Sequence, residues 1–274
     1  MAVEILYESD NFLVVNKPYD MYINSDDENE KNTVTHHIAS GDSHLSTSVN
    51  PIHFVQRLDY STSGVLCIAK NKTAAGRAGK LFEKRETKKY YLALVRGHVQ
   101  HELCDIEYDV GLDPLTAQTS HRMLVRKTPS CKSCVLPRVA HTRMFLLETG
   151  YYDKDPVSVV LLNPITGRRH QLRVHCAAIG HTILGDYTYS DAADNAPHRM
   201  FLHAMRLVLP VDGEHLDIQT TDPFFSDKKF TDRWKSCKKY HKFQSKEDFL
   251  LICDIVDKVY VLGVRYKRFV CKDK

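Results

Sequence analysis

The sequence contains no apolar run long enough to cross a membrane, which excludes a chain that spans a bilayer as a helix. Its first ten residues also lack the basic flank and the small-residue cleavage site of a secretory signal. The 274 residues are 43% hydrophobic and 26% charged, which is typical of an ordinary globular protein. We therefore expect a protein without membrane contact in the cytoplasm, with the nucleus as the alternative.

Cysteine and histidine are present without a pattern of metal ligands. The eight cysteines are scattered and lack the framework of a disulfide-rich secreted domain. Cys131 and Cys134 form the only CxxC, and no second ligand pair follows at the spacing of a zinc knuckle. Neither a Rossmann nor a P-loop fingerprint is found. We expect neither a metal nor a cofactor.

Positive charge is concentrated near the C-terminus. Residues 227–274 hold 14 Lys and Arg against 7 Asp and Glu, whereas the first 226 residues hold 24 against 27. A basic segment of this kind can bind RNA phosphates, although a solvated basic face is the commoner meaning of such a bias. The length suits one large domain or two small ones.

The first chemically informative stretch is 56–64. Arg57 and Asp59 stand two positions apart, and hydroxyl side chains follow at positions 61 to 63. The apolar run 65–69 is short and β-branched at two positions, which predicts a buried strand. A carboxylate at the mouth of such a strand suits catalysis, but Asp59 and the hydroxyls can equally satisfy backbone groups of a turn. The residues alone leave both interpretations open.

The second informative stretch is 166–180. Apolar side chains at positions 172, 176 and 179 share one helical face, and the glycine at 180 stands where a left-handed residue ends a helix. Arg168 and Arg169 therefore fall near the N-terminus of this predicted helix, where backbone N–H groups favour anions. The pattern predicts an anion-binding corner.

Hydrophobic periodicity and capping residues predict most of the other elements. Strands are expected at 4–7, 12–16, 88–95 and 157–162, a helix capped by Asn71 at 72–85, and a short helix at 249–256. Ser245 and Asp248 have the spacing of a capping box before that last helix, and residues 259–262 and 266–270 suggest a hairpin that turns at Gly263.

Three motifs, in this order, resemble those of the RluA-type pseudouridine synthases. They are Arg57-Leu58-Asp59 with Thr62-Ser63-Gly64, then Lys89-Tyr90-Tyr91, and the run Thr166-Gly167-Arg168-Arg169-His170-Gln171-Leu172-Arg173-Val174-His175. One position departs, because the family usually has His immediately before the first Arg, where this chain has Gln56. The resemblance covers about residues 3–224. It implies an α+β fold, with a long, mostly antiparallel sheet flanked by helices and loops around a central cleft.

The resemblance also implies roles for individual residues. In the family the aspartate of the first motif is catalytic, which maps to Asp59. The arginine that pairs with it maps to Arg168, and the tyrosine whose ring lies against the target base maps to Tyr91. Residues expected to bind or shape the site for the substrate are Arg57, Thr62, Arg169, His170, Gln171 and Arg173. The implied domains are a catalytic domain at 1–224 and a basic C-terminal extension at 225–274, packed on the domain or flexible.

The activity implied is the isomerisation of uridine to pseudouridine in RNA, on a uridine flipped out of its stack. The partner is then a tRNA, an rRNA or an mRNA, and we expect a monomer. The alternative is a catalytically inactive RNA-binding protein that retains the synthase fold, which the departure at Gln56 would fit. A hydrolase with an Asp nucleophile would need a second carboxylate or a His base at a matched position, and no motif here supplies one.

Overall fold

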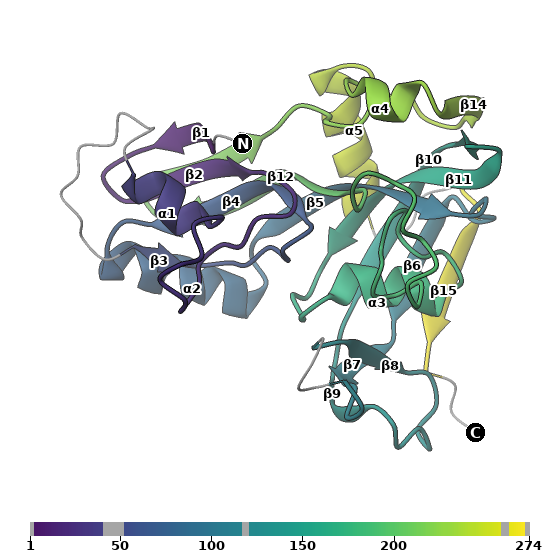
Figure 1. The fold of residues 1–274 in the computed structure, drawn as a ribbon, viewed down its shortest axis with the longest axis horizontal. Helices are drawn as coiled ribbons and strands as arrows, with labels where there is room; N and C mark the ends of the chain where they lie inside the picture. The colour runs from purple at the N-terminus through teal and green to yellow at the C-terminus, as the bar shows by residue number, and fades with distance from the viewer. Residues whose placement is uncertain (1–2, 41–51, 117–120, 259–262, 272–274) are drawn as a thin grey trace. The chain divides into compact units, whose positions relative to one another are not determined.

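The computed structural model describes residues 3–40, 52–116, 121–258 and 263–271 (Figure 1). The chain divides into two compact units, Met1–Lys89 with Leu202–Asp222, and Tyr90–Phe201 with Pro223–Lys274. Each unit is therefore built from segments that lie far apart in the sequence. No helix in the described parts of the chain is long and apolar enough to cross a membrane.

The first unit is built around β4, whose residues are all buried. Its strands are β1 (Glu4–Glu8), β2 (Phe12–Lys17), β3 (His53–Phe54), β4 (Ser63–Ala69), β12 (Leu202–Val211) and β13 (Glu214–Gln219). Antiparallel pairs join β1 to β2, β2 to β4, β3 to β4, and β12 to β13. Between β4 and β12 the pairing is parallel, with Ser63 opposite His203 and Gly64 opposite Ala204. A strand with neighbours on both sides and both faces covered needs the continuous apolar sequence that predicted it.

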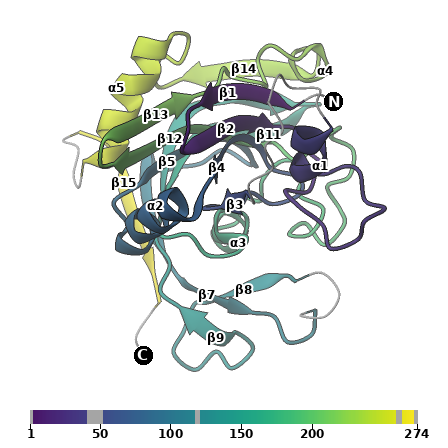
Figure 2. The same ribbon diagram turned by 90° about the vertical axis from the view of Figure 1, so that its left-hand side faces the viewer.

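Helix α2 (Lys72–Lys84) covers one face of these strands (Figure 2), and α1 is Val34–Ala39. The Asn71 side chain accepts a hydrogen bond from the Ala74 amide at 2.8 Å, so the predicted cap is confirmed. Ala74 and Ala78 are buried in the cluster that contains apolar residues of β2, β4 and β12. Arg85 ends the helix in a left-handed conformation.

The second unit has a sheet centred on β10. Its strands are β5 (Lys88–Arg96), β6 (Leu103–Glu107), β10 (Thr142–Tyr152), β11 (Asp155–Pro164), β14 (Trp234–Lys239) and β15 (Tyr266–Val270). The order is β5, β11, β10, β6, β15, with antiparallel pairs except for the parallel pair of β6 and β15. Along the edge of β10, residues 142–145 pair with β6 and residues 148–152 pair with β14. A smaller sheet has the order β8 (Met123–Arg126), β7 (Asp109–Leu112), β9 (Val135–Arg138).

Helices α3 (Gln171–Ala178), α4 (Lys228–Thr231) and α5 (Lys246–Asp257) belong to the second unit. The capping box of Ser245 and Asp248 that the sequence predicted is present at the start of α5. Phe249, Ile252 and Val256 are buried on the apolar face of this helix. The first arm of the predicted hairpin, 259–262, lies outside the described residues, and its second arm is β15. The described part of 225–274 thus supplies two strands of the second unit's sheet.

Strands β4 and β12 approach each other so closely at Gly64 that a side chain there should destabilise the protein. The φ of Gly64 is +111°, and a Cβ at this position would lie 2.3 Å from the Ala204 carbonyl oxygen. We expect Gly64→Ala to lower the free energy of unfolding by about 3 kcal/mol or more, from backbone strain and overlap together. Urea denaturation measures the change.

The matched control is Gly76→Ala in α2, where an added Cβ meets no atom within 4 Å. Alanine is the better helix former, so this variant should gain about 0.5–1 kcal/mol. Equal stabilities for the two variants would contradict the steric argument.

Candidate active site

A short turn before β4 presents Asp59. The Thr62 amide donates to the Asp59 carbonyl at 3.1 Å, which closes the turn. Leu58 and Thr62 are buried, whereas Asp59 is half-buried and Arg57 is exposed. The two buried neighbours anchor the turn, so the Asp59 carboxylate and the Arg57 guanidinium are held at the surface of the first unit.

Lys17 holds the same turn from inside, and the sequence analysis did not single it out. Its side chain is 0% exposed, and Nζ donates to the carbonyls of Pro18 (2.9 Å), Met21 (2.7 Å) and Tyr60 (2.9 Å). Tyr60 is the residue after Asp59, so the buried ammonium restrains the backbone beside the carboxylate. A lysine at the end of an otherwise buried apolar strand is the signal that could have identified it.

Polar side chains also fix the strand that follows the turn. Ser63 Oγ and His203 Nδ1 are 2.7 Å apart, and His203 Nε2 is 2.7 Å from Thr220 Oγ1. Both ring nitrogens of this buried histidine therefore have hydroxyl partners. Gln56, which departs from the family motif, donates through Nε2 to the Val65 carbonyl at 3.1 Å. Its side chain thus bonds to the backbone of β4, which is a structural role.

In the second unit, Gln171 organises the loop that carries Arg168. Its Oε1 accepts from Thr166 Oγ1 (2.7 Å) and from the Arg168 amide (2.9 Å). Its Nε2 donates to the His141 carbonyl (3.0 Å) and to Thr142 Oγ1 (2.9 Å). The amide is 3% exposed and fully used within the protein. Gln171 therefore shapes the loop.

Arg168 and Arg169 lie at the N-terminus of α3, as predicted, and His170 follows them. Arg168 is half-buried and donates from Nε to the Val139 carbonyl at 3.0 Å, whereas Arg169 is exposed. His170 is the N-cap in a left-handed conformation, and its Nδ1 lies 3.3 Å from the Tyr189 hydroxyl. No side chain caps this helix end. The positive end of α3 and two guanidinium groups make a corner favourable to anions.

Arg173 forms an ion pair with Asp186 inside the second unit. Its Nε and Nη2 donate to the two carboxylate oxygens of Asp186 at 2.7 and 2.8 Å, and both side chains are buried. The ring of Tyr189 stacks near the guanidinium at 5.2 Å. This bidentate pair fixes α3 against the segment 183–189, so Arg173 supports the corner.

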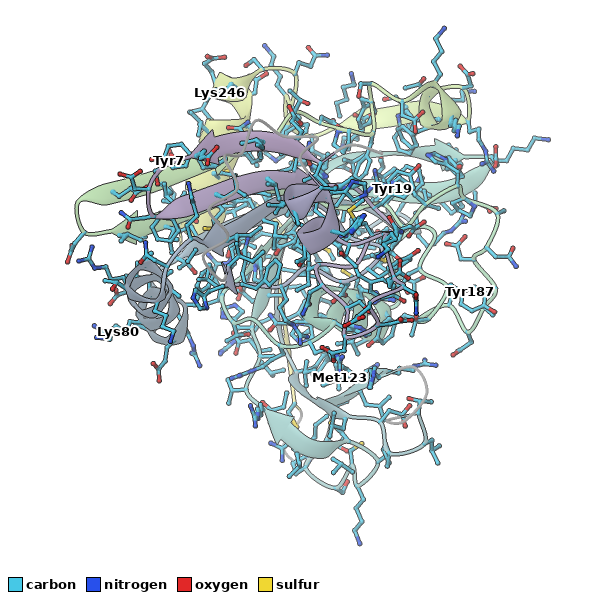
Figure 3. All side chains as sticks on the ribbon, turned by 60° about the vertical axis from the view of Figure 1, so that its left-hand side comes forward. Tyr7, Tyr19, Lys80, Met123, Tyr187 and Lys246 are labelled. Atoms are coloured by element: carbon cyan, nitrogen blue, oxygen red, sulfur yellow. The ribbon has the colours of Figure 1, made fainter. Side chains whose placement is uncertain are left out.

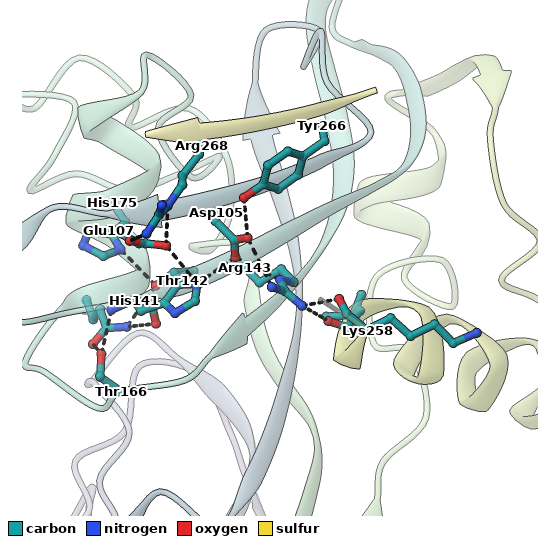
Figure 4. Close-up of polar contacts among 12 residues, drawn as sticks. Asp105, Glu107, His141, Thr142, Arg143, Thr166, His175, Lys258, Tyr266 and Arg268 are labelled. Carbon is teal, nitrogen blue, oxygen red and sulfur yellow. Dashed lines mark hydrogen bonds and ion pairs between the residues drawn. The ribbon is translucent and has the colours of Figure 1, made fainter. Parts of the chain in front are cut away.

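His175 is a buried neutral histidine. Its Nε2 is 2.9 Å from the Tyr108 carbonyl, and Nδ1 is 2.9 Å from Thr142 Oγ1 (Figure 4). A carbonyl can only accept, so Nε2 carries the proton and Nδ1 accepts from the threonine hydroxyl. Burial lowers the pKa of His175 to about 4, against the smaller opposing effect of the Tyr108 hydrogen bond.

A second network in Figure 4 surrounds the buried carboxylate of Asp105. It accepts from His141 Nε2 (2.7 Å), from Arg143 Nε (2.9 Å) and Nη2 (3.1 Å), and from the Tyr266 hydroxyl (2.8 Å). Burial alone would raise the pKa of Asp105, but these hydrogen bonds lower it far below its ordinary range. Arg143 also donates to the carbonyls of Val256 and Lys258 at the end of α5. The network joins the C-terminal elements to β6 and β10.

Tyr91 is half-buried on β5, where it pairs with Leu162 of β11. Tyr90 points to the opposite face of the strand and is buried, with its hydroxyl 2.8 and 2.9 Å from the Asp257 carboxylate oxygens. Asp59 belongs to the first unit, whereas Tyr91 and Arg168 belong to the second. The predicted residues are thus divided between the two units, and the pairing of Asp59 with Arg168 stays a prediction.

Comparison with known proteins gives the family. A family model described as RNA pseudouridylate synthase matches residues 11–178, which include Asp59, Tyr91 and Arg168. The chain belongs to the RluA family of RNA pseudouridine synthases. A relative in this family, RNA pseudouridylate synthase domain-containing protein 1 of Danio rerio, is 44% identical over 227 residues, which cover 81% of this chain and 75% of that protein. The dual-specificity RNA pseudouridine synthase RluA of Escherichia coli K12 is 35% identical over 227 residues, 80% of this chain and 93% of that one.

A solved structure confirms the fold expected of the RluA family. The structure of human RNA pseudouridylate synthase domain containing 1 has a TM-score of 0.76 and 36% identity, and the match covers 92% of this chain and 94% of that one. The structure of human RNA pseudouridylate synthase domain containing 4 has a TM-score of 0.62 and 26% identity, and the match covers 81% of this chain and 89% of that one. The predicted class, an α+β pseudouridine synthase fold with a large, mostly antiparallel mixed sheet and a few helices, is therefore confirmed.

The buried His175 makes stability depend on pH. In the unfolded chain a histidine takes up a proton near pH 6.5, whereas in the folded protein His175 stays neutral down to about pH 4. The unfolded state binds more protons in this window, so the free energy of unfolding should fall by up to about 3 kcal/mol as the pH falls from about 6.5 to 4. Urea denaturation at a series of pH values measures this loss.

The control is His175→Asn, which removes the titrating group. The variant should be less stable at pH 7, because buried partners lose hydrogen bonds, but its stability should change less between pH 6.5 and 4. The other histidines are present in both proteins, so the difference between the two curves reports mainly on His175. Identical pH dependence would contradict the assignment of a low pKa to this residue.

Proposed function

We propose that this protein isomerises uridine to pseudouridine in RNA, with Asp59 as the catalytic carboxylate. The observation that carries the proposal is the turn at Asp59 in a chain of the RluA family. Its neighbours Leu58 and Thr62 are buried and the backbone is restrained by Lys17, so the carboxylate is held in place without being enclosed. Fixed geometry of this kind suits a residue that must meet one reacting atom.

The reaction requires one well-placed carboxylate. The bond between C1′ of the ribose and N1 of the uracil breaks, the base turns, and C1′ bonds to C5. The proton on C5 leaves and N1 gains a proton, so the change is an isomerisation without net oxidation or hydrolysis. An ionised Asp59 can serve as the nucleophile or as the base, toward the sugar or toward the ring.

The other residues have supporting roles in this proposal. In this proposal Arg168 pairs with Asp59, as the family resemblance implies, and its planar guanidinium aims the carboxylate through a two-point contact. Tyr91 offers a flat ring to the flipped-out uracil. The exposed Arg57 and Arg169 bind phosphates of the RNA. Buried Thr62, Gln171 and Arg173, with the half-buried His170, hold these groups in position.

The test of the reaction is release of tritium from RNA labelled at uridine C5. Asp59→Asn keeps the shape of the side chain and removes its charge, so we expect release to fall about a thousandfold or more while RNA binding and folding persist. The control is Asp10→Asn, the same change at an exposed position of the first unit. Full activity in Asp59→Asn would overturn the proposal.

A second measurement tests the pairing of Arg168 with Asp59. Arg168→Lys retains the positive charge but loses the planar fork, so kcat should fall on the order of 10- to 100-fold with little change in RNA affinity. Arg77→Lys, at an exposed position of α2, is the matched control and should leave kcat unchanged. A kcat in Arg168→Lys equal to that of wild type would contradict a two-point contact.

The alternative is a catalytically inactive RNA-binding protein that retains the fold. The hydrogen bond from Gln56 to the backbone of β4 gives this departure from the family motif a structural role, so it does not favour the inactive reading. Tight RNA binding by the wild type without tritium release from any cellular RNA would favour it.

A further inference from the structure

Strand β14 runs along an edge of the second unit's sheet and is strongly basic. In the described residues it pairs with β10 alone. Every residue from Lys235 to Lys239 is exposed. Residues 227–246 contain eight Lys and Arg against two Asp. Figure 3 shows nitrogen-tipped side chains extending outward from the α4 and β14 ribbon.

Three carboxylates near this segment have partners of their own or face only one of its cations. Asp227 is the N-cap of α4, where it accepts from the Lys229 amide, and it also binds His198 Nε2 at 2.8 Å. Arg233 is paired with Asp153 of the β10–β11 turn. Glu148 of β10 is the register partner of Lys239. The remaining positive charge of this segment is therefore carried by the β14 lysines at 235, 238 and 239 together with those at 228, 229, 242 and 246.

Aromatic rings accompany two of these lysines. Tyr151, which is 38% exposed, is the register partner of Lys235, and side chains of directly opposed residues lie on the same face of a sheet. Lys238 Nζ lies 4.4 Å from the centre of the Tyr240 ring. Cations that bind a phosphate backbone beside rings that stack on bases are the usual composition of a surface for single-stranded nucleic acid.

We propose that β14, with Tyr151 and Tyr240, is an RNA-binding surface in addition to the residues around Asp59 and Arg168. The lysines bind phosphates of an unpaired stretch, and Tyr151 stacks on one of its bases. The choice of RNA as the ligand rests on the proposed function. A competing explanation is that lysines on an edge strand only prevent pairing with other chains. That explanation predicts no effect on RNA affinity.

The experiment measures binding of a labelled single-stranded RNA of mixed sequence by fluorescence anisotropy. The salt concentration is varied between about 50 and 200 mM, because the affinity of a protein that binds phosphates falls steeply over this range. It uses the full chain carrying Asp59→Asn, so that turnover does not alter the RNA. The test variant replaces Lys235, Lys238 and Lys239 by Gln. The matched control replaces three exposed lysines of α2, Lys72, Lys80 and Lys84, by Gln; Lys80 is labelled in Figure 3.

We expect the β14 variant to bind RNA about tenfold or more weakly at the higher salt concentration. The slope of log affinity against log salt should become shallower by about 2, since each phosphate contact on a single strand contributes about 0.7. The α2 variant should bind as the parent does. Equal losses in both variants, or no loss in the β14 variant, would overturn the proposal.

Tyr151→Ala tests the stacking contact separately. It should weaken binding by about tenfold while leaving the salt slope unchanged, because no phosphate contact is lost. Unfolding midpoints of all variants identify any that is misfolded, and Tyr151→Leu, which keeps an apolar side chain, replaces Tyr151→Ala if the latter unfolds. Unchanged affinity in the folded variant would remove Tyr151 from the surface.

Competition with poly-glutamate distinguishes RNA from an acidic protein as the partner. If the β14 lysines are needed for poly-glutamate binding and RNA affinity is unaffected by their loss, the surface binds acidic protein and the proposal is wrong. Tritium release by the wild type tests the proposed function independently. If the wild type is active but the β14 variant binds RNA as tightly as its parent, this surface alone is rejected. If the wild type is inactive but the β14 variant binds RNA more weakly, the proposed function alone is rejected.

Discussion

Buried polar side chains need hydrogen-bond partners inside the protein, and this requirement fixes both loops that carry the candidate site. In the first unit, the Lys17 ammonium binds three carbonyls, one of which belongs to the residue after Asp59. In the second unit, the Gln171 amide uses all of its donors and acceptors on the loop of Arg168 and on β10. Each unpaired group would cost about 1–3 kcal/mol, so neither loop can move without a large loss.

The same requirement makes the C-terminal segment part of the second unit. Asp105 of β6 is bonded by Arg143 of β10 and by Tyr266 of β15, and Arg143 continues to the end of α5. His141 connects this network to the Arg168 loop, because its ring binds Asp105 while its carbonyl accepts from Gln171. A continuous series of hydrogen bonds therefore runs from the C-terminal strand to the predicted anion-binding corner.

The cationic side chains fall into two groups with different physical roles. Buried ones such as Arg143 and Arg173 form two-point contacts with a carboxylate of their own unit, and their charge is used for structure. Exposed ones such as Arg57, Arg169 and Lys235 remain accessible to solvent. A negatively charged ligand meets the second group, which explains why net charge alone says little about where such a ligand binds.

The sequence by itself determined the local elements and the family. The cap at Asn71, the capping box at Ser245 and the buried strand β4 depend on residues a few positions apart, so short-range patterns predicted them. The three motifs identified the family, although the partners of their side chains could not be read from them. Tertiary structure alone decided that Lys17 restrains the Asp59 turn and that β15 pairs in parallel with β6. Tyr266 of β15 and Asp105 of β6, which share a hydrogen bond, are 161 residues apart in the sequence. Long-range partners depend on which buried groups the fold brings together, and a linear pattern carries no record of that.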